Sequence, residues 1–151
     1  FMHTGSRSAA RDKARKILKE LKLLELSDSM VRELPVPAQK RVTMATALGT
    51  EPKMLLLDEV AAGLNPAEIE GIMGSIRHIH DGMGVTVMLI EHVMELVMNV
   101  SDRLIVLDYG EKIAEGTPQQ VAKDPRVIKA YLGERYVREK AGPENGVCLY
   151  R

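Results

Sequence analysis

The stretch Leu55-Leu56-Leu57-Asp58-Glu59 decides the fold class of this chain. With Met54 it forms an apolar run that ends in two acids, which is typical of a buried strand whose carboxyl end opens onto a ligand crevice. Because side chains alternate along a strand, we expect Asp58 and Glu59 to point to opposite sides. One carboxylate could then hold Mg²⁺, directly or through water, while the other activates a water. An isolated string of this kind more often caps a helix or faces solvent, so its surroundings must decide.

The surroundings predict a βαβ unit. A second apolar run, Val85–Glu91, also ends in an acid, and both runs suit parallel strands buried on two faces. The segment Pro66–His80 between them is long enough for a crossover helix. Asn65 is a good N-terminal cap for that helix, and Pro66 fits its first turn.

Two helices are expected before this unit. In the range Ala9–Leu26 apolar residues recur at three- and four-residue spacing, which predicts an amphipathic helix. Pro35 and Pro37 are expected to exclude regular helix, so the second helix is predicted over Gln39–Leu48.

A short helix, a hairpin and two further helices are expected after the unit. The predicted ranges are His92–Val100 for the helix, Arg103–Leu107 and Lys112–Glu115 for the hairpin strands, a helix capped by Thr117, and a last helix at Pro125–Leu132.

Composition narrows the class of protein. Lys and Arg number 21 and Asp and Glu number 21, so the formal charge is zero and no nucleic-acid partner is expected. The single cysteine, Cys148, excludes an intrachain disulfide and a multi-cysteine metal site. No apolar stretch approaches the ~20 residues that span a bilayer, and no signal segment is evident, so a cytoplasmic protein is expected. The chain begins at Phe1 rather than a methionine, which suggests a fragment, a processed chain or a residue added by cloning.

Further motifs follow the acids in a particular order. They are Ala61-Ala62-Gly63-Leu64-Asn65-Pro66, Val87-Met88-Leu89-Ile90-Glu91-His92, Ser101-Asp102-Arg103 and Gly110-Glu111-Lys112-Ile113-Ala114-Glu115-Gly116-Thr117-Pro118. From about Leu34 to Glu134 this series resembles the C-terminal half of an ATP-binding-cassette transporter ATPase subunit. The ending Val127-Ile128-Lys129-Ala130-Tyr131-Leu132-Gly133-Glu134 is similar to subunits of branched-chain amino acid importers.

The resemblance implies a role for each matching residue. Asp58 would be the Mg²⁺-associated carboxylate, acting indirectly, and Glu59 the general base for the hydrolytic water. His92 would be the switch histidine that hydrogen-bonds the γ-phosphate. Asn65 would end the loop that contacts the opposite subunit, and Gln39 would contribute weakly to nucleotide binding.

Departures from the family pattern limit what the chain can do. The signature that binds the partner's nucleotide reads Leu34-Pro35-Val36-Pro37-Ala38-Gln39 here, so Pro35 replaces a serine and Pro37 has no N–H to donate. No phosphate-binding loop of the form Gly-x-x-x-x-Gly-Lys-Ser/Thr occurs. ATP and Mg²⁺ are therefore expected in the complete subunit, and no cofactor is expected for this chain alone, which is predicted inactive by itself.

The predicted fold is α/β, a partial P-loop NTPase-like (RecA-like) parallel sheet with flanking helices, preceded by part of a helical subdomain. Its expected divisions are residues 1–48, a partial helical subdomain with the degenerate signature; residues 49–133, the C-terminal half of the ATPase core; and residues 134–151, a flexible tail. In the family the phosphate-loop strand lies between the strands here numbered 85–90 and 103–107. Its loss should let those strands meet or pair with a second copy.

Three functions remain open at this point. The first is the ATP-hydrolysing subunit of an importer for branched-chain or related amino acids, bound to membrane-spanning permease subunits and to a second ATPase subunit on the inner face of the cell membrane. The second is a truncated, inactive interaction module, which the signature prolines favour. The third, a cassette ATPase of DNA repair or translation, is disfavoured by the neutral charge.

Overall fold

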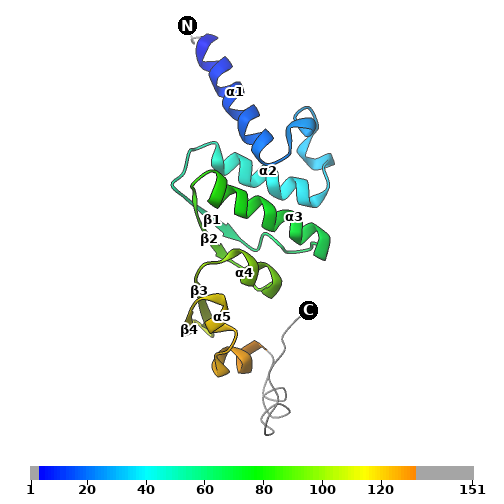
Figure 1. Cartoon of the computed structure of the whole chain (residues 1–151). Helices are drawn as coiled ribbons and strands as arrows, with labels where there is room; N and C mark the ends of the chain where they lie inside the picture. The colour runs from blue at the N-terminus through cyan, green and yellow to red at the C-terminus, as the bar shows by residue number, and fades with distance from the viewer. Residues whose placement is uncertain (1–3, 132–151) are drawn as a thin grey trace. The chain divides into compact units, whose positions relative to one another are not determined.

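A computed structural model describes residues 4–131 of the chain (Figure 1). The chain divides into two compact units, Phe1–Val100 and Ser101–Arg151. The predicted boundary after residue 48 stays a prediction, and both the predicted boundary after residue 133 and the predicted tail at 134–151 lie outside the described residues. No helix among the described residues has the length and apolar character needed to cross a bilayer.

The first unit contains the predicted βαβ arrangement. Strand β1 (Met54–Asp58) pairs in parallel with β2 (Thr86–Ile90), and the register sets Met54 beside Thr86 and Asp58 beside Ile90. Helix α3 (Pro66–Arg77) makes the crossover and continues into a π-helical turn, His78–Gly82. The carboxyl ends of β1 and β2 therefore lie side by side at one edge of the sheet.

Local sequence explains where α3 begins. The Asn65 side chain accepts a hydrogen bond from the Glu68 N–H at 3.0 Å, while the Glu68 carboxylate accepts one from the Asn65 N–H at 2.9 Å. This reciprocal pair satisfies two donors that a helix start leaves without partners, and Pro66 next to it has no N–H that would need an acceptor. The predicted cap is confirmed.

The helices before the sheet differ from the prediction in two respects. The first helix, predicted over residues 9–26, ends at Glu20, and the second begins before Gln39. The first unit contains α1 (Thr4–Glu20), two short 3₁₀ turns at Leu24–Leu26 and Val31–Glu33, α2 (Val36–Leu48) and, after β2, α4 (Met94–Val100). The prolines were expected to exclude helix before Gln39, and that is wrong. Pro35 is the cap of α2 and Pro37 lies in its first turn, where backbone N–H groups have no intrahelical acceptor.

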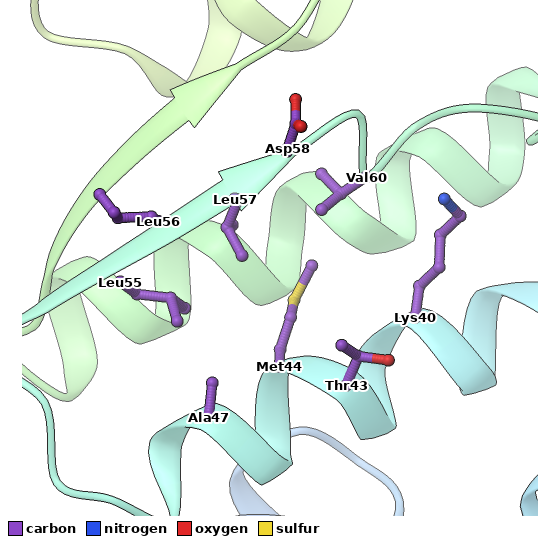
Figure 2. A pocket seen from close by; sticks show the side chains of 9 residues that line it. All are labelled: Lys40, Thr43, Met44, Ala47, Leu55, Leu56, Leu57, Asp58 and Val60. Carbon is purple, nitrogen blue, oxygen red and sulfur yellow. The ribbon is translucent and has the colours of Figure 1, made fainter.

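The prediction that both faces of the strands are buried is also wrong. Leu55 and Leu57 are buried in the core and point toward α2, whereas Leu56 between them is 68% exposed (Figure 2). On β2, Met88 and Ile90 are 54% and 60% exposed. A two-stranded sheet packed by helices on one side buries only alternate residues, so the apolar run alone did not reveal which face is covered.

The second unit is built on the predicted hairpin. Strand β3 (Leu104–Asp108) pairs antiparallel with β4 (Glu111–Gly116). The two turn residues, Tyr109 and Gly110, have φ values of 46° and 83°, the left-handed pair that a two-residue hairpin turn requires.

Helix α5 (Pro118–Val121) follows with the expected Thr117 cap, and residues 125–131 are helical. Strands β2 and β3 belong to different sheets in the described part of the chain, so the first of the two predicted outcomes, that these strands meet, is wrong. The alternative outcome, pairing with a second copy, stays a prediction.

Candidate functional site

The two acids lie where β1 ends. Asp58 is its last residue and Glu59 follows in the left-handed region, with φ of 45°. The Glu59 N–H still donates to the Ile90 carbonyl at 3.0 Å, so the backbone turns away from the sheet one residue later. Both side chains are exposed. Glu59 lies after the last residue of β1, so the alternation of side chains along a strand does not determine where its side chain points. The backbone conformation of the turn determines that direction instead.

His92 lies across from this turn. It stands two residues beyond the end of β2, and its Nδ1 lies 3.9 Å from Oε1 of Glu59, with the two side chains 66% and 62% exposed. A pair so open to water contributes at most about 1 kcal/mol to stability. The structure thus brings the predicted base and the predicted switch histidine together without making them a strong structural link.

Two residues that the sequence analysis did not single out hold the turn. Lys40, on α2, donates from Nζ to the Glu59 carbonyl at 3.2 Å. Glu91 accepts hydrogen bonds at both carboxylate oxygens, from the Ala61 N–H at 2.6 Å and from the His92 N–H at 3.2 Å. For Glu91, the sequence offered one signal: it is an acid that ends an apolar run directly before His92.

The other two predicted site residues have backbone partners nearby in sequence. Asn65 caps α3 through Glu68, as described above. Gln39 donates from Nε2 to the Leu34 carbonyl at 2.7 Å, which closes the turn before α2. Contact of Asn65 with a second subunit and of Gln39 with nucleotide stay predictions.

A hollow of about 260 Å³ lies between α2 and β1 beside Asp58 (Figure 2). Its lining residues are Lys40, Thr43, Met44, Ala47, Leu55, Leu56, Leu57, Asp58 and Val60. Most of these side chains are apolar, and the volume is below the roughly 300–1,000 Å³ typical of small-molecule pockets. Lys40 is the one cationic side chain among the lining residues, and its Nζ donates to the Glu59 carbonyl.

Asp58 fits a magnesium ion only as part of a larger set of ligands. Among the described residues, no three His, Cys, Asp or Glu side chains gather closely enough to hold a metal. Mg²⁺ keeps several waters and is commonly bound through one or two carboxylates together with substrate phosphates. A single exposed carboxylate is compatible with that indirect mode and insufficient for a site of its own.

Comparisons with known proteins show which proteins this chain is similar to. A family model described as branched-chain amino acid ATP-binding cassette transporter matches residues 111–137. The branched-chain amino acid transport ATP-binding protein BraF of Pseudomonas aeruginosa is 44% identical over 117 residues, which cover 78% of this chain and 46% of that protein. LivG of Escherichia coli, a protein of the same description, is 41% identical over 129 residues, 85% of this chain and 51% of LivG.

Solved structures give the same assignment. The ADP conformation of MJ1267, an ATP-binding cassette of an ABC transporter, superposes with a TM-score of 0.76 at 37% identity, covering 83% of this chain and 51% of MJ1267. The chain spans about half the length of the relatives that it matches. In sequence and in fold, with its partial P-loop NTPase-like parallel sheet, this chain belongs to the ATP-binding cassette family and corresponds to the C-terminal half of such a subunit.

Proposed function

We propose that this chain supplies the hydrolytic part of the ATP-binding subunit of an importer for branched-chain or related amino acids. The observation that carries the proposal is the placement of Glu59 directly after β1, with His92 facing it at 3.9 Å from the neighbouring strand end. The identity with BraF and LivG supports the class of substrate. ATP hydrolysis itself belongs to a complete cassette, of which the chain represents about half.

The roles follow from the positions of the side chains. Glu59 would orient the attacking water and take its proton at a carboxylate oxygen, because the carboxylate is exposed directly after the end of β1. His92 would donate to the γ-phosphate from the opposite strand end. Asp58 would hold Mg²⁺ through water, and the ion would supply charge neutralisation at the phosphates.

Partners and location follow as proposals from the same relatives. The subunit would bind membrane-spanning permease subunits on the inner face of the cell membrane and a second ATP-binding subunit, identical or related. Asn65 would face that second subunit. The chain taken alone would also self-associate, because in the described part of the chain β1 and β2 form a two-stranded sheet in which each strand has an unpaired edge.

The chain alone should bind ATP poorly. The sequence has no phosphate-binding loop, whose backbone amides and lysine would hold the phosphates. A titration of the purified chain with MgATP is expected to give no saturation at micromolar concentrations. Saturable micromolar binding would show that this part of the proposal is wrong.

An exchange of segments tests the function in cells. Residues 34–131 of this chain replace the matching segment of E. coli LivG, and uptake of radioactive leucine is measured. The exchanged LivG that also carries Pro35→Ser and Pro37→Gly is expected to import leucine, because those changes restore a hydroxyl and an N–H donor. The version with both prolines should transport at least about tenfold more slowly, since a hydrogen bond to a charged group contributes roughly 1.5–3 kcal/mol.

The matched negative control is Glu59→Gln in the proline-corrected version, which keeps the shape of the side chain and removes the base. Loss of uptake with normal membrane association supports the proposal. Equal uptake with and without Glu59, or no uptake by a corrected version that assembles with the permease, would refute it.

The second candidate is a truncated interaction module without catalysis, favoured by the two prolines in the signature segment. The DNA upstream of the Phe1 codon separates the two. An in-frame phosphate-binding loop there supports the enzyme, and an adjacent start codon supports the module.

A further inference from the structure

The carboxylate of Glu91 connects the ends of the two parallel strands. Oε1 accepts from the Ala61 N–H at 2.6 Å, a contact that spans thirty positions in the sequence, and Oε2 accepts from the His92 N–H at 3.2 Å. Hydrogen bonds to a charged acceptor are among the stronger ones in proteins, and a short N–H to carboxylate distance is typical of them. Glu91 is only partly exposed, so water competes weakly for its oxygens.

Ala61 gives this contact its importance. The residue is 2% exposed and packs in the core of the first unit, so an unpaired N–H there would be costly. Ala61 lies two residues after Glu59, whose left-handed conformation, with φ of 45°, is unusual for a residue with a side chain. The bond from Glu91 therefore fixes the far end of the turn that carries Glu59.

Three consecutive residues at the end of β2 contact the same turn. The Ile90 carbonyl accepts from the Glu59 N–H at 3.0 Å, the Glu91 carboxylate accepts from Ala61, and the His92 ring lies 3.9 Å from the Glu59 carboxylate. Of the three, Glu91 alone bonds both the turn and the backbone of His92. It is therefore placed to set the separation between Glu59 and His92.

We propose that Glu91 is a positioning residue that holds the proposed base Glu59 opposite His92. The role in hydrolysis rests on the proposed function, while the contact with Ala61 can be tested without it. Removal of the carboxylate should free the turn and loosen the relation between the two side chains.

The first test measures the contact in the full chain by NMR. Glu91→Ala should raise the hydrogen-exchange rate of the Ala61 amide by about ten- to a hundredfold, because a charge-assisted bond is lost. Glu91→Gln, which keeps an acceptor oxygen, should restore much of the protection. The matched control is Glu95→Ala, which removes an exposed acid on α4. Unchanged exchange at Ala61 in Glu91→Ala overturns the proposal.

The second test measures positioning. Glu59→Gln is expected to shift the ring resonances of His92 in the wild-type chain, and this shift should fall at least twofold when Glu91 is alanine and recover with glutamine. A shift of equal size in all three backgrounds overturns the proposal, because Glu91 would then be structural only. Neither measurement needs ATP hydrolysis, so the proposed function and the role of Glu91 are tested separately. Failure of leucine uptake in the LivG exchange would refute the proposed function, whereas the contact of Glu91 is decided by the amide exchange of Ala61 and the ring shift of His92.

In the proline-corrected LivG exchange, Glu91→Ala should lower kcat for ATP about tenfold or more with little change in KM, as expected for a group that acts through the base rather than on nucleotide binding. An unchanged kcat overturns the catalytic part of the proposal.

Discussion

Asn65 allows a structural role to be separated from a functional one. The side chain accepts from the Glu68 N–H at 3.0 Å and forms one half of the capping box of α3. Asn65→Ala removes that acceptor and leaves the N–H to solvent, which costs typically about 1 kcal/mol. For a unit the size of Phe1–Val100 this corresponds to a fall in melting temperature of roughly 4–8 °C.

Thermal and urea unfolding followed by circular dichroism at helical wavelengths measure the change. Asn65→Asp is the matched control, because it keeps an acceptor at the same position and should stay within about 0.5 kcal/mol of wild type. If the alanine variant is as stable as wild type, or the aspartate variant as unstable as the alanine variant, the capping argument is wrong. In the LivG exchange, loss of uptake by the stable aspartate variant would then report on contact with the second subunit rather than on folding.

Two further predictions concern stability and pH. Ile72→Ala in α3 should cost about 2–5 kcal/mol in urea unfolding because Ile72 is fully buried, whereas Leu56→Ala, on the exposed face, should change stability by less than about 0.5 kcal/mol; equal losses would show that the face is covered in solution. Lys13 lies 2.8 Å from Glu51 and holds the pKa of that carboxyl below its ordinary value of 4.5. A lowered folded-state pKa stabilises the fold above the unfolded pKa, and the gain is lost as pH falls through the folded value, so Lys13→Met should destabilise at neutral pH and not in strong acid. NMR titration of the Glu51 carboxyl carbon should show its pKa rising in that variant, and an unchanged pKa would contradict the pairing.

Much of the site was predictable because its residues follow strand ends. An apolar run that ends in acids specifies a strand and places those acids at its carboxyl edge, and a second run of the same kind brings His92 to that edge. The capping residue Asn65 was predictable for a similar reason, since the pattern of cap, proline and glutamate is local.

The contacts of Glu91 and Lys40 could not be predicted from the sequence. Their contacts reach across thirty and nineteen positions to backbone atoms, and backbone atoms leave no pattern in the residue types. The left-handed conformation of Glu59 was equally hidden, because neither the residue nor its neighbours are of the kind that usually marks such a turn.

The sequence by itself determined the order of strands and helices, the family and the chemical character of the strand ends, because periodicity, caps and turn residues act over a few positions. Only the tertiary structure decided which face of the strands is buried and how the turn after β1 is held. Both depend on what packs against the strands from elsewhere in the chain: helices cover Leu55 and Leu57 while Leu56 stays open, and Glu91 reaches Ala61 only because β2 lies beside β1. For Asp58 and Glu59, the apolar run placed the acids, and the neighbouring strand fixed how Glu59 is held.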